Sequence, residues 1–272
     1  MQQAYDQKEA AAIANLVMEN ITGMKKIDRI IHKDHILSAE DVQRLERYAS
    51  ELQQHKPVQY VLHEAWFCGM KFFVDESVLI PRPETEELVD WMFTEMKLAN
   101  KFASTCLDVG TGSGCIAVAL KKKLPSSMVL ACDMSEKALE VAERNARALS
   151  ADVQFQLLDF LDENQLSNLP SIDLLVSNPP YIPATEKNSI ARNVVDYEPH
   201  LALFVPDTDP IIFYRAMVSF AIRYMRKGAM IFAELHETTA QDVAHMFDMN
   251  GLQNVELKRD IHGKPRMIKA LV

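Results

Sequence analysis

Three of the chain's eight glycines stand at alternate positions in one short stretch, at Gly110, Gly112 and Gly114. The mostly apolar segment 105–109 before them is typical of a buried strand, and residues 114–123 fit a helix. Glycine at a strand–helix junction permits a tight turn and lets a ligand approach the backbone closely. The stretch therefore predicts an α/β domain with a ligand-binding loop at the carboxyl end of a strand.

The sequence after residue 104 alternates between strand and helix patterns. The predicted strands are 105–109, 128–133, 153–158, 172–177, 229–235, 254–259 and 266–271, and the predicted helices are 114–123, 135–149, 210–226 and 238–249. This alternation is typical of an α/β domain with a mostly parallel sheet. The last two strands, joined by a turn at 262–265, predict an antiparallel hairpin at the sheet edge.

The first part of the chain has a different pattern. Residues 1 to about 60 show helical spacing of apolar residues, with Ser38 placed to cap a helix, and residues 65–75 have a hairpin-like pattern. A proline-rich stretch at 79–83 suits neither a helix nor a central strand. We expect a helical domain with a hairpin linker over 1–76 and a second domain over 77–272.

Charge and cysteine content exclude several classes of protein. The net charge of −9 argues against a protein whose affinity depends mainly on phosphate contacts. We find no signal-peptide pattern and no apolar run near the roughly 18 residues of a spanning helix. The cysteines fit no zinc-site spacing and are typical of reduced thiols; they are Cys68, Cys106, Cys115 and Cys132. We expect a cytoplasmic protein without a metal, a membrane partner or a stable nucleic-acid partner.

Acidic residues accompany the glycine loop in a pattern that predicts nucleoside binding. Asp108 precedes Gly110 by two residues, and the resulting acid-x-GxGxG stretch resembles the S-adenosylmethionine loop of class I methyltransferases more than the GxGxxG of nicotinamide sites. Asp133 ends the second strand, where a carboxylate can accept hydrogen bonds from ribose hydroxyls. Asp159 and Phe160 follow the third strand, where they can reach an adenine amino group and cover its ring.

The fourth strand runs into Asn178-Pro179-Pro180-Tyr181. The two prolines make a rigid turn that presents the Asn178 side-chain oxygen and the Pro179 carbonyl as acceptors. A planar NH₂ group has two donors to match them, and Tyr181 can supply a flat wall. The site therefore suits methylation of an amino group on an sp² carbon, by in-line attack on a sulfonium methyl that needs no metal.

These motifs resemble the HemK/PrmC family of release factor glutamine methyltransferases. The resemblance runs through most of the chain in order; its elements are 57–60, 79–86, the glycine loop, 159–160, 178–181, 198–199 before 202–203, and 259–266. It implies a Rossmann-like seven-stranded domain with a small N-terminal helical domain, joined by a β-hairpin. It also implies methylation of the glutamine amide in the GGQ motif of class I peptide chain release factors, in translation termination. His63 and residues 204–210 depart from the family pattern.

The expected site follows from the residues and the resemblance together. Cofactor contacts are expected from Asp108, Gly110, Thr111, Gly112, Ser113, Gly114, Asp133, Asp159, Phe160 and Asn178. Substrate contacts are expected from Asn178, Pro179, Pro180 and Tyr181, of which Asn178, Pro179 and Tyr181 carry the chemistry. The resemblance implies S-adenosylmethionine as the cofactor, with S-adenosylhomocysteine as its product.

Three other functions remain open at this stage. One is glutamine methylation of a ribosomal protein, which has the same chemistry. Another is adenine-N6 methylation of DNA, although residues 1–76 carry nine basic against twelve acidic residues, a net charge of −3. The third is a non-enzymatic S-adenosylmethionine-binding module, which has no need of an intact amide clamp.

Overall fold

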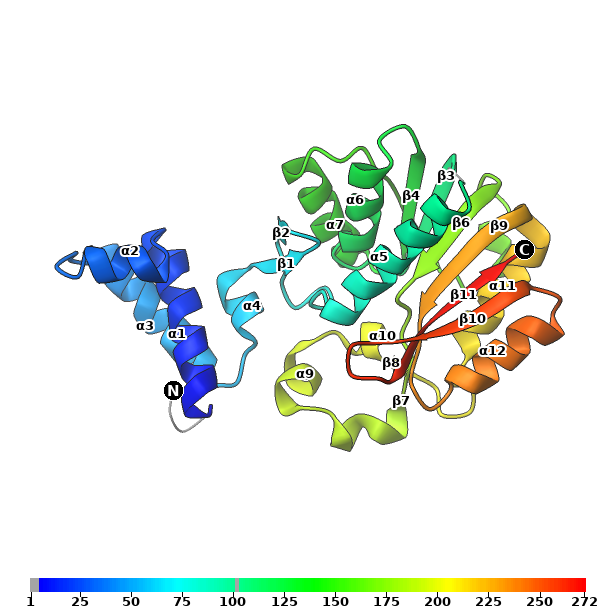
Figure 1. The fold of residues 1–272 in the computed structure, drawn as a ribbon. Helices are drawn as coiled ribbons and strands as arrows, with labels where there is room; N and C mark the ends of the chain where they lie inside the picture. The colour runs from blue at the N-terminus through cyan, green and yellow to red at the C-terminus, as the bar shows by residue number, and fades with distance from the viewer. Residues whose placement is uncertain (1–4, 101–102) are drawn as a thin grey trace. The chain divides into compact units, whose positions relative to one another are not determined.

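The protein divides into two compact units. The computed structural model describes residues 5–100 and 103–272 (Figure 1). The first unit contains the described residues up to Glu64 together with Ala191–Tyr197, and the second contains those of Ala65–Ile190 and Glu198–Val272.

The first unit is helical and has its own apolar core. Its helices are α1 (Gln7–Thr22), α2 (Lys26–Ile31), α3 (Ala39–Gln53), α4 (Val58–Leu62) and α9 (Arg192–Tyr197). Asp6 caps α1, and Ser38 caps α3 by accepting from the backbone N–H of Asp41, as its position in the sequence predicts. The core is formed by Ile13, Val17, Ile21, Tyr48, Leu52 and Val61.

The second unit is built on a seven-stranded sheet. Its strands are β3 (Thr105–Val109), β4 (Met128–Asp133), β5 (Gln154–Leu157), β6 (Ile172–Ser177), β9 (Met225–Glu234), β10 (Gln253–Arg259) and β11 (Pro265–Leu271). Their order is β10-β11-β9-β6-β3-β4-β5. The pairs from β9 to β5 are parallel, whereas β11 runs antiparallel to both β9 and β10. The predicted seven-stranded fold and its edge hairpin are confirmed.

Helices cover both faces of this sheet. The longer ones are α5 (Pro83–Leu98), α6 (Cys115–Lys123), α7 (Glu136–Ala148), α11 (Ile212–Tyr224) and α12 (Ala240–Met249). The core on one face includes residues of α5, α6 and α7, and the core on the other includes residues of α11 and α12 (Figure 1). Alternate residues of β3 serve the two faces, since Cys106 lies in the first core and Leu107 in the second. This arrangement leaves the carboxyl ends of the central strands to form a site.

Small elements complete the second unit. They are β1 (Ala65–Phe67), β2 (Met70–Phe72), α8 (Glu163–Leu166), β7 (Ile182–Pro183), the 3₁₀ helix η1 (Ala184–Ser189), α10 (His200–Leu203) and β8 (Phe204–Val205). The β1–β2 hairpin belongs here by packing, because Phe67 and Phe72 are buried in the α5–α6 core. The sequence pattern grouped this hairpin with the N-terminal segment instead.

The expected helices of the second unit begin and end within two residues of their observed bounds. Strand β9 is the larger difference, because it begins at Met225, where it pairs with Ile172 beyond a register shift. In the part of the chain that the structure describes, no helix combines the length and apolarity that a membrane span requires.

Candidate active site

The glycine loop turns sharply between β3 and α6. Gly110, Gly112 and Gly114 all have positive φ, at 69°, 52° and 80°. The backbone N–H groups of Gly110 and Thr111 donate to the Cys132 carbonyl, which ties the loop to the end of β4. A Cβ at Gly110 or Gly112 would enter open space, whereas at Gly114 it would lie 3.1 Å from the Cβ of Ala142. The first two glycines therefore leave room for a ligand, and the third allows α6 to pack against α7.

Asp108 supports the loop from beneath. It is fully buried, and its Oδ2 accepts from the Thr111 hydroxyl at 2.7 Å and from the backbone N–H of Ala117 at 3.1 Å. Burial raises the pKa of this carboxyl to about 7. Its Oδ1 has no hydrogen-bond partner among the described residues.

Asp133, at the end of β4, closes the loop from the other side. Its Oδ2 accepts from the backbone N–H of Gly112 at 2.9 Å, and its Oδ1 accepts from that of Ser135 at 3.0 Å. Burial raises the pKa of this carboxyl, and these backbone hydrogen bonds oppose the rise. A carboxylate oxygen has further acceptor capacity, so Asp133 can also receive a hydroxyl.

One pocket lies at the carboxyl ends of β3, β4 and β6. It encloses about 1030 Å³ of empty space, its open mouth included. Of the residues expected at the site, it is lined by Gly110, Thr111, Gly112, Ser113, Asp133, Asp159, Phe160, Asn178, Pro179 and Pro180. Apolar walls come from Val78, Ile116 and Leu158, and the pocket wall also includes Thr85. A largely apolar pocket with a few converging polar groups is typical of a small-molecule site.

Three expected site residues do not line this pocket. Asp108 lies beneath the loop, Gly114 packs against α7, and Tyr181 turns its hydroxyl away toward β9. Each of them contacts a residue or segment that does line it. They act on the pocket through the loop or the turn that they hold.

The Asn178 side chain is held by a residue from α5. Its Nδ2 donates to the Thr85 hydroxyl at 3.0 Å, and that hydroxyl donates to Oε2 of Glu234 at 2.6 Å. Glu234 ends β9 and is buried. The sequence patterns assign no role to Thr85 or Glu234. Glu234 lies one residue before the end of the predicted strand 229–235, close to the strand-end position that Asp133 occupies, and this position was the available signal.

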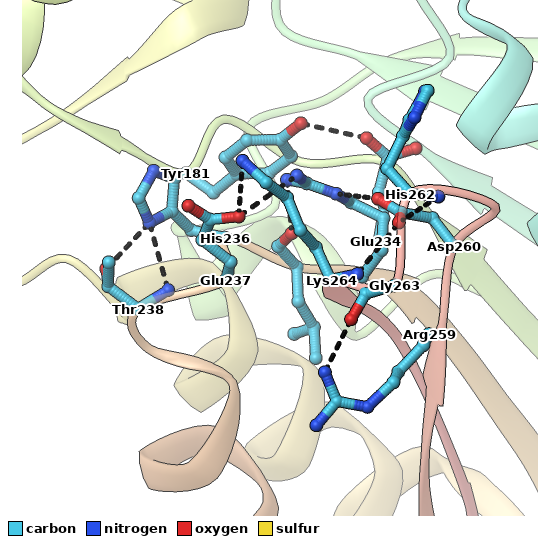
Figure 2. Close-up of polar contacts among 12 residues, drawn as sticks. Tyr181, Glu234, His236, Glu237, Thr238, Arg259, Asp260, His262, Gly263 and Lys264 are labelled. Carbon is cyan, nitrogen blue, oxygen red and sulfur yellow. Dashed lines mark hydrogen bonds and ion pairs between the residues drawn. The ribbon is translucent and has the colours of Figure 1, made fainter.

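The same carboxylate holds the tyrosine of the turn. Figure 2 shows the Tyr181 hydroxyl directed at Glu234, at 2.8 Å from Oε1. Burial raises the pKa of Tyr181 well above its usual value, and the charge of Glu234 raises it further, so the phenol remains a donor. Burial also raises the pKa of Glu234, while hydrogen bonds from Thr85 and Tyr181 and the charge of Arg266 lower it.

A loop from the C-terminal hairpin lies on the far side of Glu234 (Figure 2). Arg266 donates to Asp260 at 3.2 Å and to the Leu235 carbonyl at 3.1 Å. Asp260 accepts in turn from the backbone N–H groups of His262 and Lys264. The 259–266 element of the resemblance thus forms a structured turn that sets a guanidinium near the buried carboxylate.

The two departures from the family pattern also have structural counterparts. His63 follows α4 with φ at 53°, a left-handed position that favours glycine. In the 204–210 stretch, β8 pairs with β7, and Asp207 accepts from the backbone N–H and the hydroxyl of Thr185. The stretch is therefore ordered by its own aspartate.

The sheet order, the glycine loop and the pocket at the strand ends together give the fold of class I methyltransferases. Solved structures share this fold: a methyltransferase from Pyrococcus furiosus has a TM-score of 0.53 at 14% identity, covering 82% of this chain and 96% of its own. The hMettl16 catalytic domain has a TM-score of 0.57 at 14% identity, covering 86% and 81%.

Sequence relatives give a narrower assignment. Family models match residues 92–200 as a methyltransferase small domain and residues 1–62 as a PrmC N-terminal domain. A release factor glutamine methyltransferase from Bacteroides thetaiotaomicron is 42% identical over 99% of this chain and 95% of its own length. Another, from Flavobacterium psychrophilum, is 38% identical over 97% and 93%. The chain belongs to the release factor glutamine methyltransferase family.

The methyl donor of this class is S-adenosylmethionine, and the residues of the pocket fit it. The space in front of Gly110 and Gly112 would be filled by a Cβ, and Asp133 presents a carboxylate beside it. Phe160 and Leu158 provide apolar surface for a planar base. S-adenosylmethionine supplies an electrophilic methyl group on a sulfonium.

Proposed function

We propose that this enzyme methylates the side-chain amide nitrogen of the glutamine in the GGQ motif of class I release factors. The relatives named release factor glutamine methyltransferase cover nearly the whole chain, including the N-terminal unit. The Asn178–Tyr181 turn at the pocket edge is the observation that carries the chemistry. The enzyme would act in the cytoplasm, in translation termination.

The turn supports this reaction through two acceptors. Because Nδ2 of Asn178 is held by Thr85, its Oδ1 remains to accept from a substrate amide. The Pro179 carbonyl is the second acceptor, and a primary amide has two N–H donors to match the pair. The two acceptors orient the amide nitrogen and increase its electron density. Positioning and electrostatic stabilisation would therefore supply most of the acceleration.

The loop residues would bind the cofactor. Backbone groups of Gly110 to Ser113 would lie against it, Asp133 would accept from ribose hydroxyls, and Asp159 and Phe160 would contact the adenine. Asp108 and Gly114 would shape the loop rather than touch the ligand, since both lie outside the pocket wall. Tyr181 would serve the turn from behind, through Glu234.

We further propose that the N-terminal unit recognises the body of the release factor. This unit contributes no residue to the pocket wall. A separate family model, the PrmC N-terminal domain, matches residues 1–62. The division of labour would follow the predicted domains, recognition in 1–76 and methyl transfer in 77–272, except at the β1–β2 hairpin. This hairpin lies within 1–76 but packs into the core of the second unit, so it would serve as part of the transferase.

Labelled methyl transfer tests the proposal. Purified enzyme should label an intact release factor and fail with a factor whose GGQ glutamine is changed to alanine. Ribosomal proteins and duplex DNA, the alternative substrates, should stay unlabelled. Methylation of DNA, or of a ribosomal protein in preference to the factor, would replace the proposed function.

A variant at the turn tests the chemistry. Asn178→Ala should lose mainly kcat while the unfolding temperature changes little, because the residue's main role is to orient the amide nitrogen that receives the methyl group. A kcat near that of the wild type would reject the amide clamp.

A further inference from the structure

The turn at 178–181 is fixed from behind by one buried carboxylate. Glu234 accepts from Tyr181 directly and from Thr85, which in turn accepts from Asn178. The first and last residues of the turn are thus connected to the same side chain. Glu234 is only 2% exposed and does not line the pocket.

The direction of these hydrogen bonds matters. An ionised carboxylate only accepts, so both hydroxyls must point their protons at Glu234. The Thr85 oxygen then has only lone pairs to offer Asn178, and the amide must present its NH₂ group to Thr85. The opposite amide orientation would place two donors where a substrate NH₂ also donates. The partners of an amide decide which of its ends is oxygen.

We infer that Glu234 and Thr85 are positioning residues that set the acceptor face of Asn178 toward the substrate. This inference rests on the proposed function, because it names the residues that orient its amide clamp. Glu234 accepts the Thr85 proton, and the Thr85 oxygen is then left to accept from Asn178. Tyr181 donates to the same carboxylate and holds the other end of the turn.

Several groups around Glu234 favour its ionised form against the effect of burial. Burial raises the pKa of Glu234, and the charge of Glu84 at the start of α5 adds to the rise. The hydrogen bonds from Thr85 and Tyr181 and the charge of Arg266, from β11, lower it. Tyr214 donates to the backbone carbonyl of Glu234 at 2.9 Å and leaves the carboxylate oxygens to Thr85 and Tyr181. The Arg266 guanidinium itself donates to Asp260 and to the Leu235 carbonyl.

Three variants separate positioning from folding. Thr85→Val removes the hydroxyl at nearly constant volume, and Thr85→Ser keeps it. Glu234→Gln replaces an acceptor-only group with one that also donates, so the Thr85 hydroxyl can turn toward Asn178 and reverse the amide. Glu95→Gln is the matched control, because Glu95 lies on the same helix as Thr85 and contacts Lys269 instead.

The kinetic test uses the full-length enzyme with an intact release factor. Thr85→Val and Glu234→Gln should each lower kcat by about 10²-fold, the scale of a misplaced reacting group, with much smaller changes in KM and cofactor affinity. Thr85→Ser should recover most of the rate, and Glu95→Gln should retain it. An unchanged kcat in Glu234→Gln, or equal losses in Thr85→Val and Thr85→Ser, would overturn the inference.

Nuclear magnetic resonance gives a readout that needs no turnover. The Asn178 side-chain NH₂ signal, assigned by its absence in Asn178→Ala, should shift in Thr85→Val and Glu234→Gln but not in Glu95→Gln. An unshifted signal overturns the inference even if release factor is methylated. If the signal shifts as expected while wild-type enzyme fails to label the factor, the positioning role stands and the proposed function fails.

Discussion

Two of the three glycines of the cofactor loop, Gly112 and Gly114, should respond differently when each is changed to alanine. All three have positive φ, but only at Gly114 would the new Cβ meet protein, 3.1 Å from the Cβ and 3.2 Å from the Cα of Ala142. At Gly112 it would enter the open pocket. Gly251, after α12 with φ at 83° and nothing within 4 Å, isolates the backbone cost alone.

The expected magnitudes follow from these surroundings. A non-glycine residue in the left-handed region costs about 1–2 kcal/mol, which a stiffer unfolded chain offsets by about 0.4–1 kcal/mol. Gly251→Ala and Gly112→Ala should therefore lose about 1 kcal/mol of unfolding free energy. Gly114→Ala adds the cost of overpacking, about 1–3 kcal/mol, because backbone atoms of Ala142 cannot move aside freely.

Scanning calorimetry with and without S-adenosylmethionine measures both effects. Each kcal/mol should lower Tm by roughly 2–4 °C in a chain of this size. Saturating cofactor should raise the Tm of wild type and Gly251→Ala alike, but should have little effect on Gly112→Ala, whose Cβ occupies the ligand's place. If Gly114→Ala unfolds no earlier than Gly251→Ala, the packing argument is wrong. If Gly112→Ala binds S-adenosylmethionine as the wild type does, this loop does not form the cofactor site.

Three further perturbations have defined outcomes. Asp133→Ala should weaken cofactor binding by about 1.5–3 kcal/mol, because ribose hydroxyls lose a charged acceptor; calorimetric titration showing wild-type affinity would remove Asp133 from the site. Burial raises the pKa of Asp108 to about 7 in the folded protein, so its contribution to stability falls as the pH rises from about 4 to 7. In denaturant titrations, the difference in unfolding free energy between wild type and Asp108→Asn should change with pH in that window and stay constant above it. A difference that does not depend on pH would contradict the raised pKa. His63→Gly should unfold at a higher temperature than His63→Ala, since only glycine relieves the positive φ; equal unfolding temperatures would show that no strain is stored there.

The fold was readable from the sequence because its local signals agree with one another. Buried strands such as 105–109 and 172–177 are short, mostly apolar segments between turn signals, and their observed bounds match the expected ones. The hairpin at 65–72 was found as a hairpin, but its two phenylalanines pack into a core formed by residues far along the chain. Sequence spacing carries no information on which core an aromatic side chain will join.

The site residues were predictable only where a sequence motif has few structural roles. Glycines after a strand and the Asn178–Tyr181 turn have few structural alternatives, so their place at the pocket could be anticipated. Thr85 and Glu234 were not assigned, because they lie 149 positions apart and meet only through the packing of α5 against β9. Tyr181 was expected as a wall of the site, yet burying its hydroxyl requires a partner, and Glu234 provides one behind the turn.

Recognition of the whole release factor is a separate requirement from the chemistry. A carboxamide is a weak nucleophile, since its lone pair is delocalised, so catalysis depends on holding it close to the methyl group, an effect worth up to about 7–11 kcal/mol. In the proposed reaction, the turn at 178–181 would contact only one side chain of the substrate. Binding energy from a remote surface must supply the remaining order. A short GGQ peptide should therefore be a much poorer substrate than the intact factor.

The exposed isoleucines of the N-terminal unit are the strongest candidates for that surface. Ile30 on α2 is 62% exposed and Ile36, in the following loop, is 87% exposed, and large exposed apolar side chains are a feature of protein-binding surfaces. Ile30→Lys and Ile36→Lys should lower kcat/KM for the intact factor while leaving the peptide reaction unchanged. Met249→Lys, at the 72% exposed end of α12, is the control and should alter neither. If both isoleucine variants methylate the factor as the wild type does, this surface does not read the substrate, and the ordering energy must come from the transferase unit itself.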